Sequence, residues 1–314
     1  MKNKPNVIFL GPLEGFNSSK EILDGFANII NVEPNISSIA KHLGLVDGII
    51  DASMKLKIDK DIIKKATNLK IISCATTGSS HIDSEYTKKR GIEVRTLKED
   101  KDLIKNLTPA AELSWALLMN CARNLNHAIN HVQNGNWDRE KFPGIMIKGK
   151  TIGIIGCGRI GTWMSKYASA FGMNIIGFDP YIKQNETKIK LVNIDELAKK
   201  SDFISIHIHL DKSTTGIIDN KFLSKCKKGV ILINTSRGEI INEIDLVENL
   251  EKKIVGAVGV DVLCNEPDIS NSHLYKYSLN NSNVFITPHC GGYSPDAVKI
   301  VSARAAEKIK TFYK

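Results

Sequence analysis

The sequence predicts an α/β fold with two doubly wound parallel sheets, each in its own domain. Short apolar runs alternate with amphipathic segments of helical period along nearly the whole chain, which is the pattern of strand–helix units in a parallel sheet. The length of 314 residues exceeds the usual size of one domain and favours two. A long, charge-poor helical segment at 109–132 separates two series of these units.

The first hundred residues contain the first series. Apolar runs predict four strands, at 7–10, 48–51, 70–74 and 93–97. Helical periodicity predicts the intervening helices at 17–27, 59–67 and 83–90, the second and third of which open on an aspartate.

The middle of the chain begins with one helix over 109–132, whose start carries Pro109 in the first turn. An exposed loop is expected at 134–150. The second series then predicts strands and helices at 151–155, 160–171, 174–178, 203–206, 230–233, 243–252, 255–260, 284–287 and 295–313.

Composition excludes several classes of protein. No apolar stretch has the length of a membrane span or of a secretory signal, so no membrane partner is expected. The six cysteines form no CxxC pair or metal-ligand pattern, which favours reduced thiols in a cytoplasm and no metal site. The net charge of +9 comes from dispersed lysines without interleaved aromatic residues, and no nucleic-acid partner is expected.

A glycine-rich turn follows the predicted strand at 151–155. Its glycines, Gly156, Gly158 and Gly161, form the GxGxxG pattern at the start of a helix. This pattern permits a tight turn, close approach of a pyrophosphate and close packing of helix on sheet. The next strand ends in Asp179, whose carboxylate suits the ribose hydroxyls of NAD and would repel the 2′-phosphate of NADP. NAD is therefore the expected cofactor.

Three further strands are followed by polar residues, namely Arg237, Glu266 and His289. A guanidinium matches a carboxylate bidentately, a histidine is a proton donor near neutral pH, and a carboxylate beside it raises its pKa. Hydride transfer to C2 of a 2-oxo acid needs these three groups. Each also has an ordinary reading, as a surface arginine, a turn glutamate and a loop histidine. Their shared place after strands of one sheet favours the catalytic reading.

Taken together, these motifs resemble those of the D-isomer-specific 2-hydroxyacid dehydrogenases. The resemblance covers most of the chain, at 69–83, 110–123, 135–137, 151–161, 222–242, 261–267 and 287–292. The chain resembles the D-3-phosphoglycerate enzymes of this family, and the regulatory C-terminal domain that some of them carry is not expected.

The resemblance implies a Rossmann-like cofactor domain at 105–289, inserted into a flavodoxin-like substrate domain at 1–104 and 290–314. It also implies that Thr77, Gly78 and Ser79 bind the substrate carboxylate through backbone amides, together with Arg237. A homodimer is implied at family level. Besides the glycines and Asp179, it assigns cofactor contacts to Thr77, Arg159, Ile160, Thr235, Ser236, Asp261, Gly291 and Gly292.

Two segments depart from the family pattern. After the strand at 203–206 the chain reads His207-Ile-His209-Leu, where relatives often have His-Thr-Pro, and a structural role is expected for His209. The loop at 75–80 also differs from the commoner form, so 3-phosphoglycerate, lactate and glyoxylate all stay open as substrates. The alternatives are an NAD-sensing scaffold of the same fold and an NADP-dependent glyoxylate or hydroxypyruvate reductase.

Overall fold

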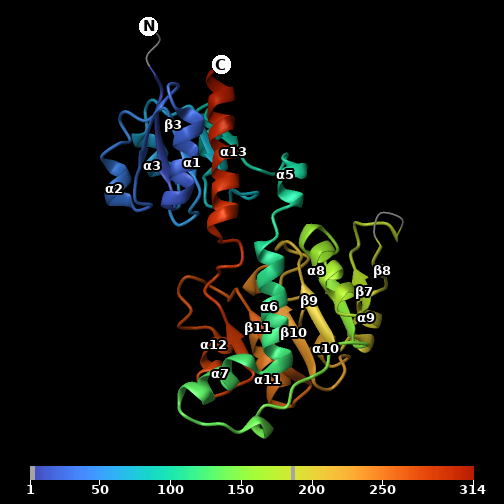
Figure 1. The fold of residues 1–314 in the computed structure, drawn as a ribbon. Coiled ribbons are helices and arrows are strands. Elements are labelled where there is room, and N and C mark those ends of the chain that lie inside the picture. The colour runs from blue at the N-terminus through green and yellow to red at the C-terminus, as the bar shows by residue number, and fades with distance from the viewer. Residues whose placement is uncertain (1–3, 185–187) are drawn as a thin grey trace. The chain divides into compact units, whose positions relative to one another are not determined.

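The structure is a computed structural model that describes residues 4–184 and 188–314. The chain forms two compact units, coloured by residue number in Figure 1. Unit 1 contains the chain up to Leu107 and again Tyr293–Lys314, and unit 2 contains Thr108–Gly292. The boundaries expected from the sequence, after 104 and after 289, lie slightly earlier than these.

Unit 1 is built on a five-stranded parallel sheet. The strand order is β2-β1-β3-β4-β5, which is the flavodoxin-like order. The strands are β1 (Asn6–Leu10), β2 (Asn28–Asn31), β3 (Gly48–Asp51), β4 (Ile71–Cys74) and β5 (Glu93–Arg95). The helices are α1 (Leu13–Leu23), α2 (Ile36–Ala40), α3 (Lys60–Lys65), α4 (Ser84–Lys89), α5 (Lys101–Lys105) and α13 (Pro295–Tyr313).

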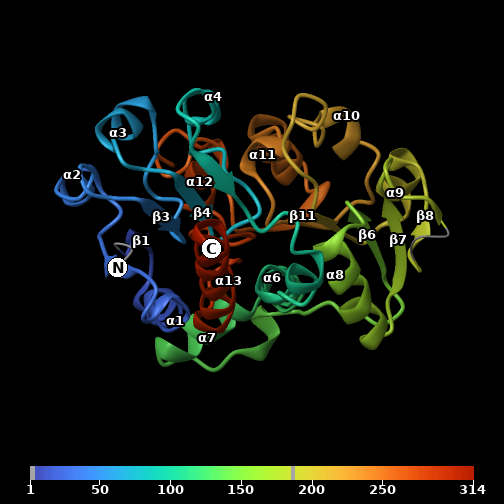
Figure 2. The same cartoon turned by 90° about the horizontal axis from the view of Figure 1, so that it is seen from above.

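Two apolar layers cover the faces of this sheet. On one face, Val7, Phe9, Ile50 and Ile71 pack in one cluster with side chains of α1 and α13. Those two helices run side by side, although they come from opposite ends of the sequence (Figures 1 and 2). On the other face, alternate strand residues pack against α2, α3 and α4. Because helices cover both faces, every residue of the central strands β3 and β4 is buried, and most of these residues are apolar.

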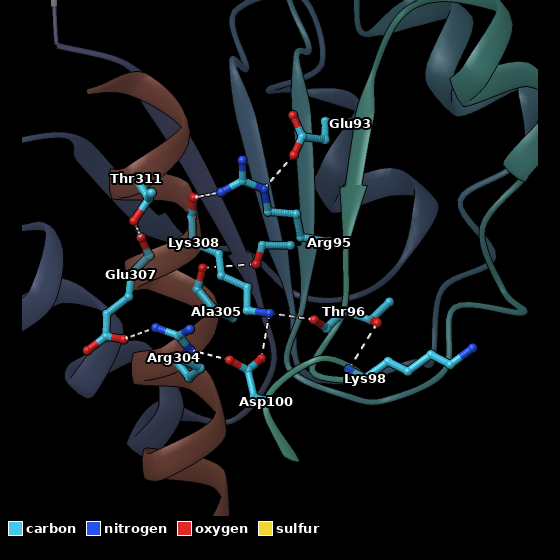
Figure 3. A network of polar contacts seen from close by, with 11 residues as sticks. Glu93, Arg95, Thr96, Lys98, Asp100, Arg304, Ala305, Glu307, Lys308 and Thr311 are labelled. Atoms are coloured by element: carbon cyan, nitrogen blue, oxygen red, sulfur yellow. Dashed lines mark hydrogen bonds and ion pairs between the residues drawn. The ribbon is translucent and has the colours of Figure 1, made fainter. Parts of the chain in front are cut away.

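A charged network joins α13 to the segment that leaves unit 1 (Figure 3). Asp100, which is 7% exposed, accepts a hydrogen bond from Arg304 Nε at 2.6 Å and forms an ion pair with Lys308. Lys308 Nζ also donates to the carbonyl of Thr96 at 2.6 Å. Burial alone would raise the pKa of Asp100, but the two cations outweigh it and lower this pKa below its usual value. These contacts attach the segment that precedes α5 to α13 within unit 1.

Unit 2 is built on a seven-stranded parallel sheet of order β12-β11-β10-β9-β6-β7-β8. Counted along the chain, this is the Rossmann order with one added edge strand. Its strands are β6 (Thr151–Ile155), β7 (Asn174–Phe178), β8 (Lys190–Leu191), β9 (Phe203–Ile206), β10 (Val230–Asn234), β11 (Val255–Val260) and β12 (Val284–Ile286).

Helices cover both faces of the second sheet (Figure 2). α6 and α8 pack on one face, and α9–α12 pack on the other. The helical segments are α6 (Pro109–Arg123), α7 (Leu125–Gln133), α8 (Arg159–Ala170), α9 (Ile194–Lys200), α10 (Asn220–Leu223), α11 (Glu243–Glu251) and α12 (His273–Ser278), with short 3-10 turns at Arg139–Lys141 and Gly238–Ile240. Among the described residues, no helix combines the length and apolar character needed to cross a membrane.

The predicted fold class, two doubly wound parallel sheets, is confirmed. The prediction of one helix over 109–132 was wrong, because the backbone turns at Asn124, whose φ is +50°. Asparagine adopts this left-handed conformation more readily than most residues, so it ends α6 and α7 starts in a new direction. The first helix covers Leu13–Leu23 and not 17–27, since Pro12 precedes its first turn. The short elements β2, β8, α2, α5, α9, α10 and α12 were not predicted.

Candidate active site

The glycine turn between β6 and α8 has little room for side chains. Gly156 has φ +91°, and a Cβ there would lie 2.5 Å from the carbonyl oxygen of His207. At Gly161 a Cβ would clash with the carbonyl oxygen of Gly156. At Gly158, by contrast, no described atom lies within 4 Å of the position that a Cβ would take, so the backbone is open to a ligand. Arg159 and Ile160 are the first residues of α8 and directly follow this open position, where the N-terminus of a helix favours an anion.

Asp179 follows β7 beside the same turn. Its Oδ2 accepts the amide of Cys157 at 2.9 Å, and its Oδ1 accepts the amide of Tyr181 at 3.0 Å. The carboxylate is half-buried and fixed by these bonds. Each oxygen keeps a further lone pair, which suits a ribose hydroxyl, and the negative charge would disfavour a 2′-phosphate. The turn and Asp179 therefore fit NAD, whose pyrophosphate would lie over Gly158.

His289 and Glu266 form a direct pair beyond the carboxyl ends of β11 and β12. His289 Nδ1 and Glu266 Oε1 lie 2.8 Å apart, with side chains 45% and 29% exposed. The hydrogen bond to Glu266 raises the pKa of His289, against the opposing effects of burial and of the Arg237 charge. Nε2 of His289 has no hydrogen-bond partner within the described chain, so this nitrogen is available to a substrate.

Arg237 follows β10, the neighbour of β11 in the sheet. Its side chain is exposed and donates from Nη1 to the carbonyl of Ser236 at 2.6 Å. The loop that carries it is held by Asn234, which is fully buried and donates to the carbonyl of Arg237 at 2.8 Å. Asn234 Oδ1 also accepts the amide and hydroxyl of Ser236. Thr235 shares a 2.7 Å hydrogen bond with Ser114 of α6.

Asp261 holds the loop that carries His289 through hydrogen bonds. It is 1% exposed, and it accepts hydrogen bonds from the amides of Cys290 at 2.9 Å and Gly291 at 2.7 Å, as well as from the Thr287 hydroxyl. These bonds enclose His289, whose φ of +53° is unusual for a residue with a side chain. Asp261 therefore fixes a strained loop and with it the imidazole. The resemblance assigned Asp261 to the cofactor, and that role stays a prediction.

Glu243 supports the glutamate in the same way, and it was not predicted from the sequence. This first residue of α11 is 8% exposed and accepts hydrogen bonds from the amide of Cys264 at 3.2 Å and the hydroxyl of Ser272 at 2.8 Å. It also accepts the amide of Leu274 at 3.3 Å. The bonds hold both ends of the segment that carries Glu266. The sequence signal was weak: an acidic residue at N1 of a helix, directly after an Asn cap, is usually exposed, but this helix packs against α12.

The loops that carry Arg237 and Glu266 are in direct contact. A Cβ at Gly238 would clash with the backbone of Leu263, so only glycine permits this approach. The structure thus brings Arg237, Glu266, His289, Asp261 and Gly291 to one edge of one sheet. Gly292, the last residue of unit 2, is exposed and follows them directly.

The predicted carboxylate loop lies in unit 1, directly after β4. The amides of Thr77, Gly78 and Ser79 donate to no group in the part of the chain that the structure describes. Thr77 and Gly78 are exposed, and no described atom would meet a Cβ at Gly78 within 4 Å. Consecutive amides without partners on small residues are able to bind an anion.

The unusual histidines after β9 have separate environments. His207 is half-buried with a buried Nδ1, its Nε2 lies 2.7 Å from the Ser205 hydroxyl, and burial of the ring lowers the pKa of His207 to about 3. It is therefore neutral at physiological pH. His209 is exposed, and its carbonyl accepts the Thr214 hydroxyl at 2.7 Å.

Comparison with known proteins places this site in a family. Residues 115–291 match the model for the NAD-binding domain of D-isomer specific 2-hydroxyacid dehydrogenases. The chain is 37% identical to hydroxypyruvate reductase of Thermotoga maritima, over 81% of this chain and 80% of that protein. It is 38% identical to D-3-phosphoglycerate dehydrogenase of Methanocaldococcus jannaschii, over 81% of this chain but only 47% of that one. The chain thus spans about half the length of the D-3-phosphoglycerate dehydrogenases that it matches.

The fold agrees with a solved member of the same group. D-lactate dehydrogenase of Aquifex aeolicus, solved in complex with NAD and lactic acid, superposes with a TM-score of 0.79 at 26% identity. The match covers 98% of this chain and 95% of that one.

Proposed function

The chain belongs to the family of D-isomer specific 2-hydroxyacid dehydrogenases, and we propose that it transfers hydride between NAD(H) and C2 of a small D-2-hydroxy or 2-oxo acid. The observation that carries this proposal is the 2.8 Å pair of His289 and Glu266 on the sheet edge that also carries Arg237. Bound NADH would supply the hydride, held at Gly156, Gly158, Gly161 and Asp179. Arg159, Ile160, Thr235, Ser236, Asp261, Gly291, Gly292 and Thr77 are proposed as further contacts.

His289 is proposed as the acid and base. Glu266 occupies Nδ1, so the proton that moves is the one on Nε2. In the reducing direction, His289 gives this proton to the oxygen on C2 of the acid, and Glu266 stabilises the imidazolium beforehand by raising its pKa. In the oxidising direction, the neutral Nε2 takes the hydroxyl proton back.

Arg237 is proposed to bind the substrate carboxylate. Its guanidinium has donors left after the single bond to Ser236, and a fork of two N–H groups matches a carboxylate. The positive charge of Arg237 also opposes the rise in the pKa of His289 that Glu266 causes. The free amides of Thr77, Gly78 and Ser79 in unit 1 are proposed as a second group of carboxylate donors.

As substrate we propose 3-phosphoglycerate or a related small acid. The support is the positive net charge of +9 and the hydroxyl groups at Thr76, Thr77, Ser79 and Ser80, which suit an anion with more than one acidic group. Two similar proteins, a D-3-phosphoglycerate dehydrogenase and a hydroxypyruvate reductase, are named for small acids of this kind.

The test is oxidation of NADH, followed by absorbance, with a panel of 2-oxo acids that includes phosphohydroxypyruvate, hydroxypyruvate, pyruvate and glyoxylate. We expect turnover with at least one acid and a strong preference for NADH over NADPH, because of Asp179. Tight NADH binding without turnover of any acid would instead support an NAD-sensing scaffold. Faster turnover with NADPH would contradict the cofactor assignment.

We also propose a cytoplasmic homodimer. The six cysteines are all free thiols, as in a reducing compartment. On α7, Leu125, Ile129 and Val132 are 49%, 47% and 50% exposed at helical spacing, which forms an apolar stripe suited to a second copy. Light scattering should give the mass of a dimer, and Ile129→Glu should give a monomer. A monomeric wild type would contradict the dimer.

A further inference from the structure

Unit 1 contains a buried acid–imidazole pair that the proposed chemistry does not use. Asp51, the last residue of β3, is 1% exposed, and its Oδ2 lies 2.6 Å from Nε2 of His81, whose side chain is 10% exposed. The other carboxylate oxygen accepts the amide and hydroxyl of Ser53, at 2.9 and 3.0 Å, and the amide of Met54 at 3.2 Å. One carboxylate therefore connects the loop after β3 with the loop after β4.

The loop after β4 depends on Asp51 at both of its ends. At the start, Ala75 donates its amide to the carbonyl of Asp51 at 2.8 Å. At the end, His81 lies in a tight turn closed by the amide of Ile82 on the carbonyl of Ser79 at 3.0 Å, and its ring is attached to the Asp51 carboxylate. The three free amides of Thr77, Gly78 and Ser79 lie between these two attachments.

The pair is not complete by itself. Nδ1 of His81 is buried and has no hydrogen-bond partner in the described part of the chain. Buried polar groups with a purely structural role are normally satisfied. His127 Nε2 and His207 Nδ1 are also buried without a partner among the described residues, so what distinguishes His81 is its place two residues from a row of free amides.

We propose that Asp51 and His81 are positioning residues that set the geometry of the Thr77–Ser79 amides and thereby the affinity for the substrate carboxylate. This inference rests on the proposed function. Amides that hold a carboxylate contact it equally before and during the reaction, so their loss weakens binding without slowing the chemical step. A defect in the pair should therefore raise KM and leave kcat unchanged.

The experiment compares Asp51→Asn, His81→Asn and His81→Gln with wild type, using the best acid of the panel. Asp51→Asn keeps the shape of the side chain but removes the carboxylate that His81 contacts, and it serves as the second variant if His81→Asn is poorly folded. His81→Gln keeps a donor that can reach Asp51 and should restore most of the affinity. His42→Asn, another histidine of unit 1 outside this loop, is the matched control.

We expect KM to rise about tenfold in Asp51→Asn and His81→Asn. kcat should stay within about twofold of wild type, and the Kd for NADH and the melting temperature should be close to the wild-type values. A wild-type KM in both folded variants would overturn the inference, as would a fall in kcat or NADH affinity that matches the rise in KM. Calorimetric titration of the NADH-loaded protein with oxamate, an unreactive 2-oxo acid analogue, measures the binding step without turnover.

The two proposals fail in different ways. A wild type that binds oxamate but reduces no acid would contradict the proposed function, and weaker oxamate binding by the variants would still support the role of the pair. A wild type that reduces an acid, with variants of unchanged KM and oxamate affinity, would contradict the pair alone. A wild type that neither reduces the acids nor binds oxamate would overturn both.

Discussion

In each unit, a histidine in a loop after a strand contacts an acidic side chain, but the two pairs differ in exposure. In unit 2, His289 and Glu266 are 45% and 29% exposed, and the pair is held in place by the buried acids Asp261 and Glu243. In unit 1, His81 and Asp51 are 10% and 1% exposed, and the loop that we propose they hold in place has Thr77 and Gly78 exposed and Ser79 half-buried.

This difference separates chemistry from positioning. A partly exposed imidazole can exchange protons with a substrate and with water, and a neighbouring carboxylate adjusts its pKa. A buried imidazole bound to a buried carboxylate is fixed in position and suits the organisation of a loop. We therefore expect substitutions in the His289–Glu266 pair to lower kcat, and substitutions in the His81–Asp51 pair to lower the affinity for the substrate.

Removal of the exposed imidazole should have the largest effect. His289→Ala should lower kcat by about 10²- to 10⁴-fold, because the proton donor is lost, while the Kd for NADH changes little. Steady-state kinetics and fluorescence titration of NADH measure the two quantities. A kcat near that of wild type would contradict the catalytic role that we assign to the pair in unit 2 and not to the pair in unit 1.

Removal of the carboxylate from the same pair should change the pH dependence. The hydrogen bond to Glu266 raises the pKa of His289, so reduction should be fastest below this pKa and fall as the pH rises through it. In Glu266→Gln, we expect kcat/KM to decrease about tenfold at neutral pH and its alkaline limb to move to lower pH. An unchanged profile would show that Glu266 does not act through His289.

A smaller effect is expected from the buried support. Glu243→Gln loses one acceptor for the segment that carries Glu266, so kcat should fall a few-fold, by roughly 1 kcal/mol, and the alkaline limb should shift part of the way toward that of Glu266→Gln. Glu248→Gln, on the same helix but in an exposed pair with Lys252, is the matched control. If Glu243→Gln lowers the melting temperature without any shift of the pH profile, its role is only structural.

The smallest effect on activity should come from the charged network of unit 1. Asp100→Asn should leave kcat near the wild-type value but lower the free energy of unfolding by about 1–3 kcal/mol at neutral pH. The folded-state pKa of Asp100 is below its ordinary value, so its contribution is present above pH ~4 and is lost as the pH falls through the folded-state pKa. Urea unfolding at neutral and acidic pH should show the variant converging with wild type in acid. A constant difference at all pH values would contradict the ion pairs.

The sequence predicted the central strands of both sheets because they are short runs of mostly apolar residues. The short edge strands β2 and β8 were not predicted because their residues show no strong hydrophobic periodicity. The break between α6 and α7 was not predicted because it depends on the backbone conformation of one residue, Asn124. The contact of His289 with Glu266 at one sheet edge agrees with their predicted positions after strands, and the catalytic roles of Arg237, Glu266 and His289 stay predictions. Asn234, Glu243 and the Asp51–His81 contact were not predicted, because burial and side-chain partners of polar residues depend on packing between distant segments.

The central claim is that this chain transfers hydride to C2 with His289 as proton donor. The most direct measurement uses NADH with deuterium at both positions of C4 of the nicotinamide and the best 2-oxo acid, with analysis of the product by mass spectrometry and chiral chromatography. We predict one deuterium at C2 of the D isomer with wild type and at most a trace with His289→Ala. Product without deuterium at C2, the L isomer, or equal label with both proteins would contradict the account.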